Sequence, residues 1–518
     1  MTRKHLGLRT RVLTLQWPEG VQPSALPDFE SQARRLRYQA LGRACREHSI
    51  TSLFLAHHED DQAETVLMRI ASGHNGAGLQ GIKSRADIPE CFGIHGVHQS
   101  GGSDQLSSRG RRRERQRDPK LSMETPFSIE SGGVKIYRPL LGFSKRCLVS
   151  ICASRDKRWI EDETNRDPTI TQRNAVRQIL ERHRLPRALR KPNLLSLARD
   201  AMMRNEADSA MVEQYFNHCK MLVFDIRSGS VVMRFPKTLI PPIHEIPVES
   251  LSKTLDAARY RAACIIRRVM ELVSPLGGID LSRLKKAVEI IFPDLDDDSP
   301  WVVEDARVFQ TTSFTACGVM VGRQEYKSAR TGPVDSPDDP PNPSQPIGGV
   351  RLEEDPEYAW TFTRQPFMSS DSSTATNLTI IIPPATPGLH SKDDATISST
   401  SSRDTPSSSP WHLWDGRFWL HVDNRTRSSL TIRPLRESDL KPFRLALSPK
   451  SRRQLQQRLS DAAPDKVRWT LPAIANERDE VIALPTLNVN RDRDQETQDV
   501  DYTVRYKSVD LGSGGQGE

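Results

Sequence analysis

The sequence predicts an α/β fold that starts with a parallel sheet, and three observations support this prediction. Residues 9–17 alternate apolar and polar side chains, which is typical of a strand, and residues 29–48 carry apolar residues at helical spacing. TSLFLAH at 51–57 is a short apolar run, and the spacing from Asp60 to Ile70 is again helical. Strands that alternate with helices in this order are typical of a parallel sheet.

Length and composition predict several domains and an anionic partner. A chain of 518 residues is long enough for two or three cores, yet only 36% of it is hydrophobic and the mean hydropathy is −0.57, so part of it should remain unfolded. The formal charge of +8 and the sequence pI of about 9.1 favour a phosphate backbone as the partner. A soluble basic protein with no such partner is the alternative.

Cysteine usage and hydropathy exclude several classes of protein. The seven cysteines form no C-x-x-C pair, which predicts a reducing compartment and argues against zinc. No stretch approaches the ~20 apolar residues of a membrane span, and no signal peptide follows Met1, so we expect a protein that is neither secreted nor membrane-embedded. The start is basic and lacks acids, like a transit peptide, but its alternation favours the strand.

Composition divides the chain into five predicted parts. They are an N-terminal α/β domain at 1–183 with a polar, disordered insertion at 84–135, a mainly helical domain at 184–325, a disordered linker at 326–410, a small β-rich module at 411–490 and a tail at 491–518. The insertion and the linker are too poor in apolar residues to fold alone, whereas the module holds short β-rich runs.

The segment LFLAHHEDDQAETVLMRIASG at 53–73 is the most informative one for chemistry. A strand runs directly into an acidic helix, so His57 and His58 should lie at the carboxyl end of a strand, where open parallel sheets bind ligands. Asp61 and Glu64 are three residues apart and share a helix face. Such carboxylates can hold Mg²⁺ over a pyrophosphate or orient an amino acid's ammonium group. The alternative is that acids in a first helical turn only complement the helix dipole.

Arginines on two other predicted helices could bind phosphate. In ESQARRLRYQAL (30–41), Arg34 and Tyr38 are one turn apart, although a solvated basic helix face would have the same pattern. Arg173 and Arg177 are also four residues apart and should project from one face toward a phosphate. In isolation, surface arginines behind an N-terminal helix cap would be the better explanation of the second pair.

Taken in order, these strings resemble the motifs of the tRNA(Ile)-lysidine synthetase family. They are E-x-x-A-R-x-x-R-Y-x-x-L at 30–41, HHxDDQxET at 57–65, a glycine-rich stretch at 73–82, RPLL at 138–141 and W-x-E-D-x-T-N-x-D...R-N-x-x-R at 159–177. The resemblance covers residues 1 to about 300, and WDGRFWL at 414–420 is similar to the accessory module of fungal members. It implies a PP-loop ATP pyrophosphatase domain, which is Rossmann-like and of the adenine nucleotide alpha hydrolase-like type.

The resemblance implies a ligase that forms a carbon–nitrogen bond. ATP would adenylate the carbonyl oxygen of the wobble cytidine in tRNA(Ile), and the ε-amine of L-lysine would then displace AMP, with Mg²⁺ as the metal. Two alternatives are a related ATP pyrophosphatase that thiolates tRNA, which commonly uses the cysteine pairs that this sequence lacks, and a catalytically inactive tRNA-binding paralogue. Mitochondrial localisation follows only by likeness, with the cytoplasm as the alternative.

The same resemblance implies roles for individual residues. The expected catalytic residues are Asp61, Glu64, His57 and His58, of which Asp61 and Glu64 are also the expected metal ligands. Nucleotide binding is expected of Arg34, Tyr38 and His57, and substrate or tRNA binding of Asp162, Asn165, Arg173, Asn174 and Arg177.

Family members bind ATP through an S-G-G-x-D-S loop after the first strand, and we do not find this loop in the expected place. SGGSDQ at 100–105 and SGGV at 131–134 are similar strings, but they follow the acidic motif and lie in a polar segment, so we interpret them as coincidental. The domain is therefore expected to be truncated at its N-terminus and to bind ATP poorly as written. An incomplete gene model is favoured over a truncated paralogue, because loss of a central strand would leave backbone groups unpaired.

Overall fold

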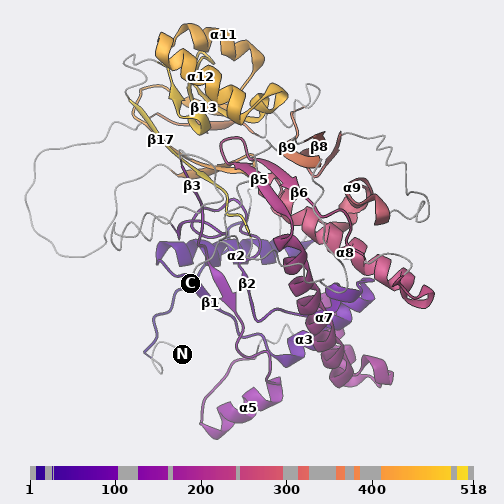
Figure 1. The fold of residues 1–518 in the computed structure, drawn as a ribbon. Helices are drawn as coiled ribbons and strands as arrows, with labels where there is room; N and C mark the ends of the chain where they lie inside the picture. Colours follow the sequence, from indigo (N-terminus) through magenta and orange to yellow (C-terminus); the bar gives the residue numbers. More distant parts are fainter. Residues whose placement is uncertain are drawn as a thin grey trace, which may run out of the picture. The chain divides into compact units, whose positions relative to one another are not determined.

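The computed structural model divides the chain into two compact units (Figure 1). It describes residues 7–17, 26, 28–102, 127–161, 167–240, 245–295, 313–325, 358–367, 378–384, 410–491 and 499–511. The first unit comprises Met1–Arg109 and Ser131–Met211, and the second comprises Gly110–Glu130 and Val212–Glu518. The predicted boundary near residue 184 therefore lies inside the first unit.

The first unit surrounds a small sheet with helices. Its elements are α2 (Phe29–Glu47), β1 (Ser52–Phe54), α3 (Glu59–Ala71), β2 (Arg85–Asp87), β4 (Lys135–Tyr137), α5 (Lys145–Ser154), α6 (Gln172–Arg182) and the start of α7 (Lys191–Asn217), with 3-10 turns at Gly76–Leu79 and Arg187–Leu189. The helices predicted at 29–48, from Asp60 to Ile70 and after Ser144 are confirmed, whereas the strand predicted at 9–17 is wrong, because residues 7–17 form no regular element.

The sheet of the first unit is mixed rather than wholly parallel. Its strand order is β1-β4-β2, in which β1 runs parallel to β4 and β2 runs antiparallel to it. The prediction of a polar, disordered insertion at 84–135 is wrong at both ends. At its start, β2 is formed and Ile88, Cys91 and Val97 are fully buried next to it; at its end, Val134 is buried and β4 begins at Lys135. Residues 103–126 of that insertion lie outside the described part of the chain.

Two hydrophobic cores flank α3 and β1. One joins α2 to the sheet and the turns that follow β2, and it consists of Tyr38, Cys45, Ile88, Cys91, Val97, Val134 and Ile136. The other packs α3 against α6 and α7 through Ala63, Val66, Leu194 and Ala198. The chain between β1 and α3 is thus held between two packed regions.

The strings SGG at 100–102 and SGGV at 131–134 pair with each other. Gly101 and Gly132 form an antiparallel bridge, and Gly102 donates a hydrogen bond to the carbonyl of Ser131 at 2.8 Å. Gly101 has φ +86°, and a Cβ on it would lie 2.6 Å from Gly96 Cα. These glycines are explained by close backbone packing, in agreement with the prediction that the strings are coincidental.

The second unit contains an antiparallel sheet of order β5-β6-β9-β8-β7, on which α8 packs through β6 and β9. The elements are β5 (Lys220–Asp225), β6 (Ser230–Arg234), α8 (Val248–Val273), α9 (Lys285–Ile291), β7 (Ser313–Ala316), β8 (Val319–Glu325) and β9 (Tyr358–Arg364), with 3-10 turns at Leu281–Leu284 and Pro293–Leu295. The mainly helical domain predicted at 184–325 therefore includes four strands, and β9 corrects the disordered linker predicted at 326–410.

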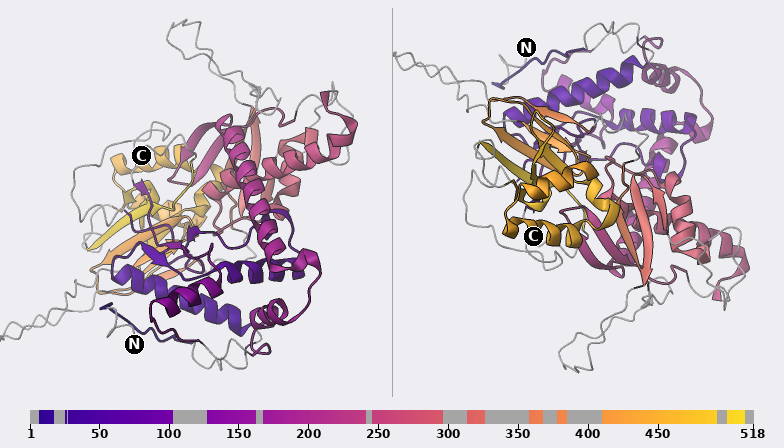
Figure 2. Two further views of the ribbon diagram at one scale, coloured as in Figure 1. Left: turned by 90° about the horizontal axis from the view of Figure 1, so that it is seen from below. Right: turned by 90° about the horizontal axis from the view of Figure 1, so that it is seen from above.

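A second sheet of the same unit has the order β10-β13-β14-β15-β16. It is built from β10 (Ile380–Ile382), which also lies in the predicted linker, β13 (Leu430–Pro434), β14 (Pro472–Ala475), β15 (Val481–Leu484) and β16 (Val489–Asn490). Helices α11 (Glu437–Leu445) and α12 (Pro449–Ala462) share a core with this sheet, and Figure 2 shows them in orange against its strands. The 3-10 turns Asp465–Thr470 and Pro485–Leu487 complete the β-rich module.

A third sheet uses the end of the chain. Its order is β11-β12-β17-β3, with β11 (Trp411–Trp414), β12 (Phe418–Asn424), β17 (Val500–Tyr506) and β3 (Ser128–Ile129). Tyr506 is fully buried and donates a hydrogen bond to the carbonyl of Leu272 at 2.7 Å. The prediction of a tail at 491–518 is therefore wrong for Val500–Tyr506, which form β17.

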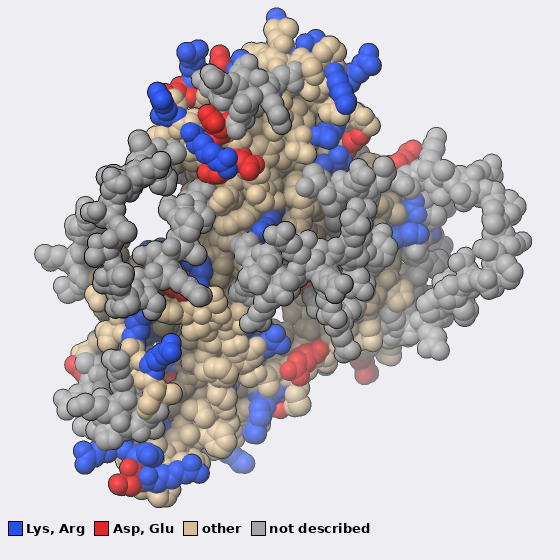
Figure 3. Space-filling view, turned by 90° about the vertical axis from the view of Figure 1, so that its left-hand side faces the viewer, with Lys and Arg blue, Asp and Glu red and all other residues tan. Residues whose placement is uncertain are grey.

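Two surface properties bear on possible partners. None of the helices in the described part of the chain combines the length and the hydrophobicity that a membrane span requires. On the face shown in Figure 3, the described Lys and Arg side chains lie in several separate groups, with Asp and Glu among them. The described basic side chains on this face therefore form separate groups rather than one continuous patch.

Candidate functional site

The site begins where β1 ends and α3 starts. Leu55 donates its backbone N–H to the carbonyl of Tyr137 at 2.9 Å, so the chain leaves the sheet beside β4. His58 is the N-cap residue of α3, and its backbone N–H donates to Asp61 Oδ2 at 2.8 Å. Three acidic residues in the first turn of α3 favour the helix electrostatically. The predicted position of the motif at the carboxyl end of a strand is confirmed.

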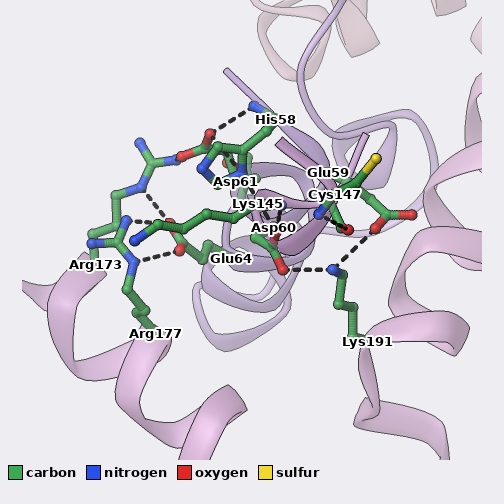
Figure 4. Close-up of polar contacts among 12 residues, drawn as sticks. His58, Glu59, Asp60, Asp61, Glu64, Lys145, Cys147, Arg173, Arg177 and Lys191 are labelled. Carbon is green, nitrogen blue, oxygen red and sulfur yellow. Dashed lines mark hydrogen bonds and ion pairs between the residues drawn. The ribbon is translucent and has the colours of Figure 1, made fainter. Parts of the chain in front are cut away.

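Two arginines of α6 bind the carboxylates of α3 (Figure 4). Arg173 bridges the acids, since its Nη2 lies 2.8 Å from Asp61 Oδ1 and its Nε lies 2.7 Å from Glu64 Oε2. Arg177 Nε lies 2.7 Å from Glu64 Oε1, and its Nη2 lies 3.1 Å from Glu64 Oε2. The Glu64 side chain is only 2% exposed, whereas those of Arg173 and Arg177 are 29% and 26% exposed, so these ion pairs are partly removed from water. Arg173 and Arg177, which were predicted to face a phosphate, thus bind the carboxylates of Asp61 and Glu64 instead.

The donor set around these carboxylates does not fit a magnesium ion. Both oxygens of Glu64 already accept guanidinium N–H groups, and both oxygens of Asp61 accept hydrogen bonds from His58 or Arg173. A divalent cation would also have to replace or approach two positive charges in a partly dry site. Among the described residues, no group of three or more His, Cys, Asp or Glu side chains gathers at metal-binding distance. We therefore assign no step to a metal held by Asp61 and Glu64.

Asp60 joins α3 to two further helices. Its Oδ2 accepts the backbone N–H of Lys145 at the start of α5, at 2.7 Å, and its Oδ1 accepts from Lys191 Nζ, at the start of α7, at 2.5 Å. Lys191 Nζ also lies 3.0 Å from Glu59 Oε2. Burial opposes the ionised form of Asp60, but these hydrogen bonds outweigh it and lower the pKa of Asp60. Sequence reasoning missed Lys191, because nothing local indicates that it faces α3.

The later residues of the motif hold the glycine-rich turn in place. Gln62 exchanges two hydrogen bonds with the backbone of Ile82, at 2.6 and 2.9 Å. Arg69 donates to the carbonyls of Gly78 and Gly81, both at 2.9 Å. A Cβ at Gly81, where φ is +70°, would lie 2.3 Å from Gln62 Oε1. The glycine is therefore required by the contact with Gln62, and this part of the motif is structural.

Arg34 and Tyr38 lie on α2 as predicted, but their environments differ. The guanidinium carbon of Arg34 lies 4.8 Å from the centroid of the Tyr38 ring, and its Nε lies 3.6 Å from Glu90 Oε1. The Arg34 side chain is 46% exposed and open to a ligand, whereas Tyr38 is 3% exposed and belongs to the core. Tyr38 therefore supports Arg34 rather than presenting its own ring to a nucleotide.

The pKa of His57 responds to charges from both the acidic motif and the arginine-bearing helices. Burial is the main cause that lowers the pKa of His57; Asp61 opposes this effect, while the charges of Arg138, Arg173 and Arg34 add to it. All four charged groups act on one imidazole, so Arg34 and the acidic motif share an electrostatic environment. Arg138, from the RPLL string, was not among the predicted site residues.

The remaining predicted substrate residues divide into two groups. Asn174 is 7% exposed and donates to the carbonyl of Asp167 at 2.9 Å, so it fixes the loop before α6. Thr171 caps α6 by accepting the N–H of Asn174 at 3.1 Å. Asp162 and Asn165 lie outside the described residues. Among the described residues of this predicted set, Arg173 and Arg177 are brought to the acidic motif, and Asn174 is not.

Comparison with known proteins identifies what the chain is similar to. A family model described as a PP-loop domain matches residues 5–95 and 115–183. A Schizosaccharomyces pombe protein named "Probable tRNA(Ile)-lysidine synthase" is 22% identical over 470 residues, which cover 90% of this chain and 75% of that protein. The chain resembles the tRNA(Ile)-lysidine synthases. The resemblance predicted from the motifs is confirmed, and the PP-loop match implies an α/β domain that uses ATP.

Two bacterial relatives of the same name match shorter stretches. The protein of Anaplasma marginale is 29% identical over 139 residues, or 27% of this chain and 21% of that protein. The protein of Bordetella parapertussis is 43% identical over 74 residues, or 14% of this chain and 21% of that protein. The chain thus spans three quarters of the fungal relative but about a fifth of these bacterial ones. The matched PP-loop ranges include every predicted site residue, whereas Lys191 lies beyond them.

Proposed function

We propose that this chain is an ATP-dependent ligase that joins lysine to the wobble cytidine of tRNA(Ile). The observation that carries the proposal is the HHEDDQAET string at the carboxyl end of β1, with Asp61 and Glu64 bound by Arg173 and Arg177. This arrangement lies within the region that matches a PP-loop domain, and the relatives described above are named tRNA(Ile)-lysidine synthases.

In the first step, the carbonyl oxygen of the cytidine attacks the α-phosphorus of ATP. A bond forms between these two atoms, and the bond from the α-phosphorus to pyrophosphate breaks. Negative charge on the phosphoryl oxygens needs nearby cations and hydrogen-bond donors. Arg34, which is half exposed, and the neighbouring His57 and His58 are suited to this task. Because its pKa is lowered, His57 is mostly neutral near neutral pH and acts as a hydrogen-bonding group.

In the second step, the ε-amine of lysine attacks the activated carbon of the cytidine, and AMP leaves. The new bond is carbon–nitrogen, the bond to the AMP oxygen breaks, and the attacking nitrogen loses a proton. Asp61 and Glu64 are the groups suited to orient the cationic lysine before attack. Arg173 bridges both carboxylates, so the lysine has to share these acceptors with it or displace it.

The proposal also concerns Mg²⁺, the groups that contact tRNA and the location of the protein in the cell. Any Mg²⁺ that accompanies ATP would take its oxygen ligands from the phosphates rather than from Glu64, whose oxygens are occupied. The exposed basic side chains of the surface are candidates for the tRNA backbone, whereas Arg173 and Arg177 would first have to release the carboxylates of Asp61 and Glu64. The mitochondrion, with the cytoplasm as the alternative, remains the predicted location, and fractionation of cells that express the tagged protein would test it.

The test is lysine incorporation into tRNA by the full-length product of the gene. Radiolabelled lysine, ATP and tRNA(Ile) with a wobble cytidine should give labelled tRNA, whereas the same tRNA with uridine at that position should not. Asp61→Ala should abolish labelling, and Glu206→Ala, which removes an exposed acid of α7, should leave it intact. Tight tRNA binding without labelling would instead support the inactive tRNA-binding paralogue, and unchanged labelling in Asp61→Ala would exclude the proposed role of the motif.

A further inference from the structure

Among the described residues, Arg138 and His57 near the site each carry a buried polar atom without a hydrogen-bond partner. Arg138 follows β4 directly, and His57 follows β1, so both leave the carboxyl ends of two parallel, hydrogen-bonded strands. Arg138 is 8% exposed, and neither its Nε nor Nδ1 of His57 has a hydrogen-bond partner among the described residues. Buried polar atoms are nearly always satisfied, so these two atoms have hydrogen-bonding capacity that a ligand at this place could use.

The Arg138 side chain is anchored through its Nη1, while its Nε is buried and has no hydrogen-bond partner among the described residues. Its Nη1 donates to the carbonyl of Lys83 at 2.8 Å, and its backbone N–H donates to the carbonyl of Ser84 at 2.9 Å. These contacts hold the guanidinium at the end of β4. No carboxylate is paired with it among the described residues, in contrast to Arg173 and Arg177. A buried arginine without an acidic partner makes its surroundings favourable to an anion.

The charges around His57 favour the same class of ligand. Arg138, Arg173 and Arg34 all act on this imidazole, against the single acid Asp61. Arg173 is neutralised by its own ion pairs and Arg34 lies 3.6 Å from Glu90, so Arg138 is the one of the three without an acidic partner in the described part of the chain. A phosphoryl group presents several acceptor oxygens and negative charge, and arginine binds it with charge-assisted hydrogen bonds.

We propose that Nε of Arg138 and the ring of His57 together bind the phosphoryl group of the nucleotide at the carboxyl ends of β4 and β1. This subsite rests on the proposed function, because it assigns the α-phosphoryl group of ATP, or of the adenylated intermediate, to a defined pair of donors. Arg138 is thus a nucleotide-binding residue, and its role is to hold the phosphoryl group while the cytidine oxygen attacks and pyrophosphate leaves.

Histidine NMR tests this subsite without tRNA or lysine. In the full chain labelled with ¹³C-histidine, the His57 signal is identified by its loss in His57→Gln. AMP should shift this signal, and adenosine, which lacks the phosphoryl group, should not. The buried His98 lies beside Asp87 and Lys135, at the opposite end of β4, and its signal serves as an internal control.

A conservative variant then isolates the guanidinium. Arg138→Lys retains the charge and can still reach the Lys83 carbonyl, but it lacks Nε–H, so AMP affinity should fall roughly tenfold. Arg85→Lys, on the neighbouring strand β2 and exposed, is the matched control and should bind AMP normally.

Two results would overturn the subsite. They are a His57 signal that AMP does not move and an equal response to adenosine. If Arg138→Lys bound AMP with wild-type affinity, the Arg138 guanidinium would not be part of the proposed subsite. The wild-type titration needs no variant, so it remains decisive if Arg138→Lys fails to fold. Lysine incorporation is measured separately, so labelled tRNA without a His57 response would refute only the subsite.

Discussion

Replacing Glu64 with glutamine should loosen helix α6. The side chain of Glu64 is 2% exposed and accepts three hydrogen bonds from two guanidiniums of that helix, at 2.7, 2.7 and 3.1 Å. Glutamine has nearly the same shape but no charge, and its amide nitrogen would face an arginine N–H group. Breaking a buried ion pair costs about 3–5 kcal/mol, and the arginines are partly exposed, so we expect a loss of about 2–3 kcal/mol.

Hydrogen exchange measured by mass spectrometry gives the local readout, because the chain has two units and a single unfolding transition is not expected. A loss of 2–3 kcal/mol corresponds to exchange roughly 30- to 150-fold faster in peptides from α6. Peptides from α12 in the other unit are the internal control. Glu181→Gln makes the same chemical change at an exposed position of α6 and should leave exchange nearly unchanged. Unaltered protection of α6 in Glu64→Gln would refute the view that these ion pairs hold the helix.

Three other outcomes follow from the site. Lys191→Met should speed hydrogen exchange at the start of α7 by the same factor between roughly pH 5 and pH 9. In the wild type, the pKa of Asp60 is lowered, so the ion pair between Asp60 and Lys191 stays intact until acid protonates the carboxylate, and its stabilising effect is lost as the pH falls. Gly81→Ala should destabilise the glycine-rich turn by about 1–3 kcal/mol in thermal or exchange measurements, whereas Gly142→Ala, with open space around it, should be nearly neutral. His57 should titrate below an ordinary histidine by NMR, and a value at or above it would contradict its burial among cations.

Several features of the fold could be predicted from the sequence because they depend on neighbours along the chain. The helices α2, α3 and α5 follow from apolar spacing and from residues such as Ser144, which caps α5. The order strand, acidic helix and glycine-rich turn also lies within one short segment. That segment carried the resemblance that the comparisons confirmed.

Strands that depend on distant partners were missed. Ile380–Ile382 is a short apolar run inside a polar region, and it forms a strand because Leu430–Pro434 lies beside it. Val500–Tyr506 was predicted to be a tail, but it pairs with Phe418–Asn424 and buries Tyr506. Short strands have little intrinsic preference of their own, so the partner decides their structure.

The sequence by itself determined the residue types of the site and the segment in which they cluster, since both follow from local order along the chain. Only the tertiary structure decided the partners of these residues. Arg173 reaches Glu64 across 109 positions, and Lys191 reaches Asp60 across 131. Helical spacing placed both arginines on one face but could not indicate what that face meets. Packing of α3 against α6 and α7 brings opposite charges together, and burial then makes each pairing strong enough to define the site.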